Sequence, residues 1–374
     1  MPKPAVIHVI TRLDLGGAQK SCLALITELQ ANYPDFEIYL ISGTQGELVK
    51  ATQKLKNVYL LDSFLWEIHP KNILLELQNF IKITTIMRQL KAKHSNIMVH
   101  THTIKAGTIG RWAALFAGIK TRIHTIHGFG FNLFQNKLVW LFFYLIELFN
   151  SFITTHFICV SSQDLQAGSE IFPKFAQKAS IIRAATLNTP CFVPSLRLKT
   201  QATILGTIAC LKTGKNLFEL LKAFKLAQKT RPELYLEIMG DGPLRPALQQ
   251  YINDHNLAQN VQILGWQHNP AIYTQKWDGF LFTSLWEGLP CALVEIQNLG
   301  IPIYSYQVGG LIDLIDKSKL IYPGKWLDLA TQIINHIPKQ TPTFPNQPDL
   351  GFYIPKMALG HNILYQRLNK HVPI

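Results

Sequence analysis

Residues 5–30 have the sequence AVIHVITRLDLGGAQKSCLALITELQ, and their pattern decides the fold class of the chain. Residues 5–10 form a short apolar run that predicts a β-strand, and residues 18–30 have the spacing of an amphipathic helix. The turn between them contains the pair Gly16-Gly17. A strand, a glycine-containing turn and a helix, in this order, form the unit from which parallel sheets covered by helices are built.

The same alternation continues through the first half of the chain. Further strands are predicted at 38–41, 58–61, 97–101, 122–126 and 157–160, and further helices at 73–90, 106–117 and 134–152. Strands that alternate with helices favour a parallel sheet with helices on both faces.

A proline-containing stretch without periodicity, residues 187–200, interrupts the alternation and predicts a linker. The alternation then resumes with strands predicted at 203–208, 234–239, 261–264, 279–282 and 301–304. A second proline-rich stretch, 338–348, precedes a last helix at 354–368. The sequence therefore predicts an α/β protein of two Rossmann-like domains that face each other across a cleft. The domains are residues 1–186, with 353–374 packing back on them, and residues 187–352.

Composition and charge restrict the class of protein. Of the 374 residues, 48% are hydrophobic and 16% are charged, which excludes general disorder. The net charge of +13 favours nucleotide phosphates, anionic lipid or nucleic acid as partners, unless the basic side chains only form a solvated surface. Nucleic-acid-binding proteins concentrate basic and aromatic residues on one element, whereas the basic residues here are spread over both halves. No nucleic acid is expected as a partner.

Cysteine usage and the lack of a visible targeting segment predict a cytoplasmic protein. The five cysteines are scattered without a C-x-x-C pair, so no zinc site is expected. No secretory signal is visible, and no apolar run reaches about 18 residues. The longest candidate, LVWLFFYLI at 138–146, predicts either a buried helix or one that faces a membrane.

The pair Gly16-Gly17 is a candidate anion site. Without side chains, the backbone can come close to a ligand, and the free N–H groups at the start of the following helix favour a negative charge. An ordinary tight turn has the same sequence. The stretch lacks G-x-G-x-x-G, so the usual dinucleotide fingerprint is missing.

The stretch SLWEGLPCALVE, residues 284–295, carries the strongest indication of function. Pro290 favours the start of a helix, so Glu287 should lie on the entry loop and Glu295 inside the helix. Two glutamates eight positions apart on one helix would point about 80° apart. With Glu287 on the loop, both carboxylates can line one pocket and accept hydrogen bonds from sugar hydroxyls. Two surface glutamates are the alternative, but they leave the apolar Leu285-Trp286 unexplained.

This stretch resembles the donor-binding half of retaining GT-B glycosyltransferases, family four in the carbohydrate-enzyme classification. The shared features are the E-x7-E pair and the pair Gly309-Gly310 after a strand. The resemblance covers nearly the whole chain, through HTIKAG at 102–107 with Gly110-Arg111, HTIHGF at 124–129, FICVS at 157–161 and MGDGPLR at 239–245. The first two motifs are similar to those of members that act on lipid-linked oligosaccharides in lipopolysaccharide or capsule assembly.

The resemblance implies a donor site for a nucleotide sugar in the C-terminal domain, bordered by Gly309 and Gly310. Glu295 would bind the ribose hydroxyls of the donor nucleotide, and Glu287 would contact the transferred sugar. Lys215 would lie on the diphosphate, and Gly16 and Gly17 would leave room for it.

The resemblance also implies a role for His127 on the N-terminal, acceptor-side domain. His127 would reach the donor sugar or the acceptor across the cleft. A histidine on an apolar strand is more often structural, and this alternative stays open for His127 and for His102.

Two positions depart from the family pattern. The family usually has an arginine five residues before the lysine, where this chain has Cys210, so one cation for the diphosphate is missing. Lys212 could replace it in part as a point charge. The usual Asn-Gly turn after the last strand of the N-terminal domain is replaced by RAAT at 183–186. Both departures bear on activity more than on fold.

The implied reaction moves a hexosyl or N-acetylhexosaminyl group from a nucleoside-diphosphate sugar, with a UDP-sugar favoured, to a polyprenyl-diphosphate-linked or other lipid-linked acceptor. It would retain configuration and need neither a metal nor a cofactor besides the donor substrate. The sequence contains no D-x-D pair. Cations and backbone N–H groups would stabilise the charge that grows on the leaving diphosphate.

A lipid-linked acceptor places the reaction at the inner face of the cytoplasmic membrane. Anionic lipid attracts a basic surface by about 1 kcal/mol per Lys or Arg, and residues 129–152 are rich in aromatic side chains. We therefore expect peripheral association through the N-terminal domain, with Trp140 and Phe143 facing lipid. In the alternative, a core helix, both side chains face inward.

Two other classes of function stay open at this point. A weakly active or inactive GT-B protein that binds a nucleotide sugar or a partner would keep the same fold, and Cys210 motivates this alternative. An oxidoreductase with two Rossmann domains would be expected to carry the dinucleotide fingerprint that is missing here.

Overall fold

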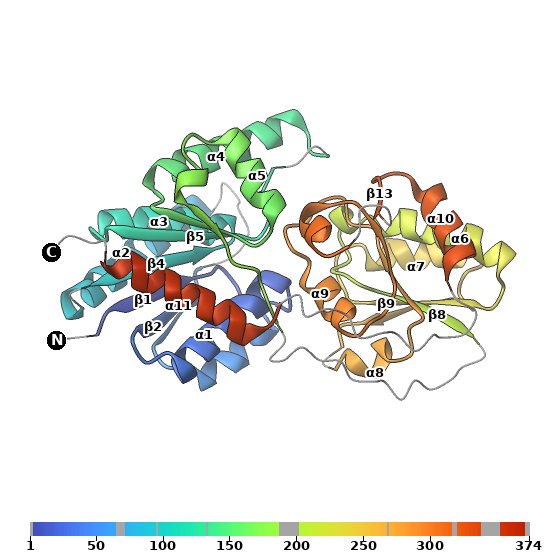
Figure 1. Cartoon of the computed structure of the whole chain (residues 1–374), viewed down its shortest axis with the longest axis horizontal. Coiled ribbons are helices and arrows are strands. Elements are labelled where there is room, and N and C mark those ends of the chain that lie inside the picture. The colour runs from blue at the N-terminus through green and yellow to red at the C-terminus, as the bar shows by residue number, and fades with distance from the viewer. Residues whose placement is uncertain are drawn as a thin grey trace. The chain divides into compact units, whose positions relative to one another are not determined.

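The computed structural model describes residues 3–64, 72–94, 96–131, 134–186, 202–267, 269–315, 320–337 and 352–370. The chain divides into two compact units (Figure 1). Unit 1 contains Met1–Thr189 and Gly351–Ile374, and unit 2 contains Pro190–Leu350. The two predicted linkers, 187–200 and 338–348, lie outside the described residues.

Unit 1 is built on a seven-stranded sheet in the order β3-β2-β1-β4-β5-β6-β7, in which all neighbouring strands are parallel. Its strands are β1 (Ala5–Val9), β2 (Glu37–Gly43), β3 (Val58–Leu61), β4 (Ile97–His102), β5 (Thr121–Ile126), β6 (His156–Cys159) and β7 (Ala179–Ile181). Its α-helices are α1 (Gly17–Asn32), α2 (Ile73–Lys93), α3 (Ile104–Phe116), α4 (Lys137–Ile153), α5 (Ser162–Ile171) and α11 (Ile354–Lys370). The strand order reverses between β1 and β4, where ligands bind in sheets of this kind.

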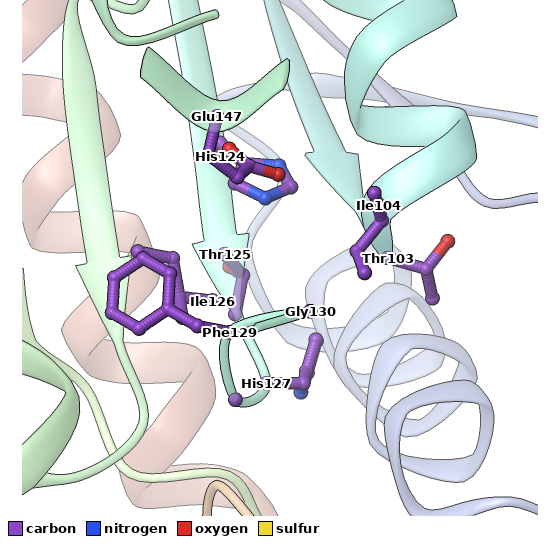
Figure 2. A pocket seen from close by; sticks show the side chains of 10 residues that line it. Thr103, Ile104, His124, Thr125, Ile126, His127, Phe129, Gly130 and Glu147 are labelled. Carbon is purple, nitrogen blue, oxygen red and sulfur yellow. The ribbon is translucent and has the colours of Figure 1, made fainter. Parts of the chain in front are cut away.

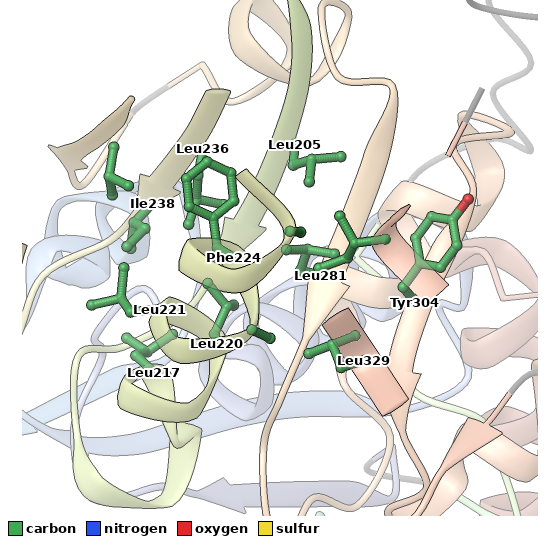
Figure 3. Packing of buried hydrophobic residues seen from close by; sticks show 14 of the residues in the cluster. Leu205, Leu217, Leu220, Leu221, Phe224, Leu236, Ile238, Leu281, Tyr304 and Leu329 are labelled. Carbon is green, nitrogen blue, oxygen red and sulfur yellow. The ribbon is translucent and has the colours of Figure 1, made fainter. Parts of the chain in front are cut away.

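Unit 2 is built on a six-stranded parallel sheet in the order β10-β9-β8-β11-β12-β13. Its strands are β8 (Thr203–Ile208), β9 (Leu234–Met239), β10 (Val261–Gly265), β11 (Gly279–Phe282), β12 (Ile303–Tyr306) and β13 (Leu320–Ile321). Its α-helices are α6 (Leu217–Thr230), α7 (Arg245–Asp254), α8 (Ala271–Thr274), α9 (Cys291–Asn298) and α10 (Trp326–His336). Figure 3 shows how leucines of α6 and of the strands form its core, with Phe224 among them.

The C-terminal helix α11 packs against α1 in unit 1, as the sequence predicts. Its buried side chains recur every three or four residues and include Met357, His361, Leu364 and Tyr365. This spacing places them on one face of the helix. The Ser21 hydroxyl of α1 lies 3.3 Å from the Met357 sulfur.

The predicted fold class, an α/β protein with two parallel-sheet units, is confirmed. The strand predicted at 301–304 begins two residues later, at Ile303 in β12, because Ile301 is part of the turn that ends α9. Gly300 adopts a φ of +69°, and the Ile301 N–H donates to the Ile296 carbonyl at 3.4 Å. The short strands β7 and β13 and the helix α5 were not predicted.

Candidate active site

Three loops of unit 2 meet at the carboxyl ends of the neighbouring strands β8, β11 and β12. They are residues 209–216, 283–290 and 307–310, and we call them the loop stack. The Leu285 N–H donates to the Gly214 carbonyl at 2.9 Å, and the Gly310 N–H donates to the Gly288 carbonyl at 2.6 Å. The loop that carries Glu287 is therefore bonded to both of the others, at the sheet edge where ligands of α/β proteins bind.

Two glycines allow this close packing. Gly309 has a φ of +51°, and a Cβ atom there would lie 1.9 Å from the Glu287 carbonyl oxygen. A Cβ atom at Gly214 would lie 2.7 Å from the Trp286 ring. The indole thus covers the backbone of Gly214, which gives the apolar side chain next to Glu287 a structural role.

Lys215 and Glu287 form an ion pair within the loop stack. Their side chains are 19% and 18% exposed, so the pair is partly shielded but open to solvent at one side. Thr283 fixes the backbone below it, because its hydroxyl donates to the Lys215 carbonyl at 3.0 Å. The structure brings together two residues that lie 72 positions apart and that the sequence assigns to one donor site.

The other predicted residues of unit 2 lie on the same elements. Glu295 is half-buried within α9, the helix that follows the Glu287 loop. Cys210 is half-buried and Lys212 is exposed, both on the loop after β8. Gly310 belongs to the loop stack through its bond to Gly288. The roles assigned to these residues stay predictions.

Gly16 and Gly17 lie at the start of α1 in unit 1. Gly16 is the N-cap in an extended conformation, and among the described residues neither a side-chain cap nor a first-turn acidic residue is found there. The preceding loop is anchored by the buried Leu13, whose N–H donates to the Gln45 carbonyl at 2.9 Å. The helix start therefore keeps the partial positive charge that favours an anion.

His127 follows β5 and borders two small hollows of unit 1. Figure 2 shows the first of them, with His127 below Gly130 and Ile126. The first is lined by residues 103–104, 124–130 and Glu147. Burial, followed by the charge of His361, lowers the pKa of His127 to about 4, so its imidazole is neutral at pH 7.

A group of buried histidines lies next to His127, and of its members only His102 was considered from the sequence. His8, His100, His102 and His361 are at most 3% exposed. Burial is the main cause of a lowered pKa in each; that of His8 falls to about 3 and that of His361 to about 4. A sequence signal existed, since His100 and His102 alternate along β4 and therefore share a face, and His100 pairs with His8 in β1.

A buried ion pair, also missed, borders the first hollow, which Glu147 lines. Arg111 is fully buried, and its guanidinium lies 3.2 Å from the Glu147 carboxylate. It also donates to the Gly107 carbonyl at 2.7 Å and to the Thr154 hydroxyl at 3.0 Å. The charge is paired and hydrogen-bonded, as a buried arginine requires.

The helix α4 has a buried and an exposed apolar side. Trp140 and Phe143 are half-buried and pack against an aromatic cluster, with the Trp140 and Phe131 rings 5.6 Å apart, which favours the alternative in which these two side chains face inward. The opposite side is exposed and includes Leu138, Val139, Leu141, Phe142, Leu145, Phe149 and Phe152. Within the described residues, no helix is both long enough and apolar enough to cross a membrane.

Comparison with known proteins agrees with this arrangement. Residues 192–342 match the family model described as glycosyl transferases group 1. UDP-Gal:alpha-D-GlcNAc-diphosphoundecaprenol alpha-1,3-galactosyltransferase of Escherichia coli is 27% identical over 321 residues, which are 82% of this chain and 80% of that protein. Among solved structures, sucrose-phosphate synthase of Thermosynechococcus elongatus has a TM-score of 0.81 at 16% identity and is matched over 99% of this chain and all of its own. HepE of Anabaena in complex with UDP has a TM-score of 0.73 at 16% identity, over 97% and 100%.

The two units together have the GT-B fold of these glycosyltransferases. Residues 192–342, which contain the loop stack, are a group 1 glycosyltransferase domain. The chain is therefore a glycosyltransferase, as predicted.

Proposed function

We propose that this enzyme transfers a hexosyl or N-acetylhexosaminyl group from a UDP-sugar to a lipid-linked saccharide, with retention and without a metal ion, in bacterial surface-polysaccharide synthesis. The observation that carries the proposal is the ion pair of Lys215 and Glu287 inside the loop stack of the matched domain. The name of the E. coli relative, with a UDP-sugar donor and a diphosphoundecaprenol-linked acceptor, supports the two substrate classes.

The chemistry of the loop stack suits a nucleoside-diphosphate leaving group. When a diphosphate enters, Lys215 can exchange its bond to Glu287 for one to phosphate, and the carboxylate of Glu287 is then available to accept from a sugar hydroxyl. As the glycosidic bond breaks, negative charge grows on the diphosphate, and a cation placed there in advance stabilises it.

The proposed donor is tested by thermal shift with UDP-, GDP- and ADP-sugars, because binding to the native state raises its stability. A UDP-sugar should raise the melting temperature most. Glu295→Ala should reduce this shift and weaken donor binding in calorimetry by about 10- to 100-fold, since hydrogen bonds to a charged group contribute about 1.5–3 kcal/mol. Glu170→Ala, on the exposed surface of α5, is the control. Equal binding by wild type and Glu295→Ala would remove the ribose role of Glu295.

We also propose that unit 1 docks on anionic lipid through the exposed side of α4. Exposed apolar residues continue on α2 and α3, where they include Ile73, Leu74, Leu77, Ile81 and Phe116. Because α3 packs against both α2 and α4, these residues belong to one helical layer. An apolar surface of this extent, on a chain of net charge +13, suits the boundary of lipid headgroups.

Liposome flotation tests the docking proposal. The wild type should float with anionic vesicles, and less so at high salt. The variant Phe142→Ser/Phe149→Ser should float less and stay folded, because both side chains are exposed. Ile272→Ser, which changes an exposed side chain of unit 2, is the control. Absence of flotation by the folded wild type at low salt would favour a soluble acceptor.

A further inference from the structure

A continuous chain of hydrogen-bonded side chains runs through the buried histidines of unit 1. From Thr125 it passes to His100, Tyr365, His8, His102 and His127, with heavy-atom distances of 2.6, 2.5, 3.4, 3.1 and 3.3 Å in that order. His100, His8 and His102 each use both ring nitrogens. We call this set the histidine chain.

Because its imidazoles are neutral, the histidine chain has a donor-to-acceptor direction. Each neutral ring has one N–H donor and one nitrogen that accepts. A ring that accepts from its neighbour on one side must therefore donate to its neighbour on the other side. The hydrogen bonds that link His8, His102 and His127 consequently all run one way or all the other, and the tautomers of these rings are coupled to one another.

Tyr365 of α11 determines the direction, because it has one proton and two imidazole neighbours. Its hydroxyl lies 2.5 Å from His100 Nδ1 but 3.4 Å from His8 Nε2. A phenol is a stronger donor than a neutral imidazole N–H, and the short distance fits an O–H donor. Tyr365 thus donates to His100 and accepts from His8. Burial raises the pKa of Tyr365, so this proton is retained at neutral pH.

The direction then propagates to His127. His8 carries its proton on Nε2, so its Nδ1 accepts from His102 Nε2–H. The Nδ1 of His102 in turn accepts from His127 Nε2–H. We propose that Tyr365, His8 and His102 are positioning residues that hold His127 as the Nε2–H tautomer, so that its Nδ1 accepts hydrogen bonds. The consequence for catalysis rests on the proposed function together with the role that the family resemblance implies for His127, namely contact with the donor sugar or the acceptor, whose hydroxyls need acceptors.

Other histidines of the chain provide an internal contrast. His94 Nδ1 lies 2.8 Å from the Lys3 carbonyl, His255 Nδ1 lies 2.9 Å from the Tyr251 carbonyl, and His361 Nδ1 lies 2.8 Å from the Met357 carbonyl. A carbonyl only accepts, so these three rings must carry the proton on Nδ1. The histidine chain therefore differs in tautomer from histidines of the same protein that can serve as references.

Nitrogen-15 NMR of the imidazole rings in the substrate-free protein tests the proposal, because it distinguishes Nδ1–H from Nε2–H. In the wild type, His127 should be Nε2–H, and His94 and His361 should be Nδ1–H. In Tyr365→Phe, the Nε2–H of His8 would have no acceptor, and a buried N–H without a partner is costly. The histidine chain should reverse, and His127 should change to Nδ1–H.

Tyr39→Phe is the matched control, since Tyr39 contacts His94 at 3.0 Å and is not in the histidine chain. It should leave His127 unchanged. A wild-type His127 in the Nδ1–H form would overturn the proposal without any variant, as would an unchanged His127 in folded Tyr365→Phe. Stoichiometric zinc in the purified protein would also overturn it, because the nitrogens of His8, His100 and His102, within 4.8 Å of one another, would then be metal ligands.

An activity assay separates this inference from the proposed function. If His127 accepts from a substrate hydroxyl, Tyr365→Phe should reduce kcat/KM, and Tyr39→Phe should not. A tautomer change without a change in kcat/KM would support the histidine chain and refute the role of His127 in the proposed reaction.

Discussion

The loop stack of unit 2 and the histidine chain of unit 1 hold their polar side chains in opposite ways, one as charged groups and the other as neutral ones. The loop stack pairs two full charges, Lys215 and Glu287, where both are about one-fifth exposed. The histidine chain buries polar rings that burial keeps neutral, and it satisfies them by hydrogen bonds alone. Under the proposed function, the partly exposed cation would stabilise a charged leaving group, and the fixed neutral ring would accept from a sugar hydroxyl.

The largest expected effect is acid sensitivity confined to unit 1. In the unfolded chain, histidines bind protons below about pH 6.5. In the folded protein, the pKa of His8 is lowered to about 3 and that of His361 to about 4, so both rings stay neutral to a much lower pH. Stability is therefore complete above pH 6.5 and is lost as the pH falls. At pH 5, protonation of these two histidines in the unfolded chain lowers the free energy of unfolding by about 4 kcal/mol in total. Each ring contributes about 1.36 kcal/mol per pKa unit. His100 and His102 add to this loss.

Hydrogen exchange between pH 7 and pH 5 should show loss of protection in β1, β4 and α11 before β8 and β9. Simultaneous loss in both units, or earlier loss in unit 2, would mean that the buried histidines do not control the stability of unit 1.

Removing the cation of the loop stack should have the second largest effect. Lys215→Ala should lower kcat by about 10²- to 10³-fold, the range found when one preorganised stabiliser of developing charge is lost. Folding should change little, because the side chain is partly exposed. Lys229→Ala, an exposed lysine of α6, is the control in the same steady-state assay. Activity within about twofold of wild type would place the diphosphate elsewhere.

Adding a cation to the loop stack should have the smallest effect. Cys210→Arg restores the arginine that the family pattern has at this position, and it should lower KM for the donor by about tenfold, near the lower end of the range for charged hydrogen bonds. The readout is donor KM at saturating acceptor. A large rise in kcat from a very low wild-type value would instead support the alternative of a weakly active protein.

The sequence predicted the sheets well, because buried parallel strands are continuous apolar runs flanked by helical periodicity. It also predicted that Glu287 lies on a loop before a helix, since Pro290 restricts where that helix begins; the structure places the helix start at Cys291. It did not predict the partner of Glu287, because the contact with Lys215 depends on the adjacency of β8 and β11, which are separated in sequence by two strands.

The histidine chain was missed for a similar reason. His8, His100 and Tyr365 come from β1, β4 and α11, and only the strand order and the return of the last helix bring them together. The orientation of α4 was also beyond the sequence, because its polar side chains Glu147, Asn150 and Ser151 lie on the buried side, the reverse of an ordinary amphipathic surface helix. The structure assigns Trp140 to the buried side and Phe142 to the exposed side.

The configuration of the product tests the central claim most directly. The purified enzyme is incubated with an α-linked UDP-sugar, a diphosphoundecaprenol-linked saccharide and EDTA, and the new linkage is assigned by proton NMR. We predict an α-linked product, formed at an equal rate with and without EDTA, and its loss in Lys215→Ala. A β-linked product, or transfer that stops in EDTA and returns with a divalent cation, would contradict this prediction.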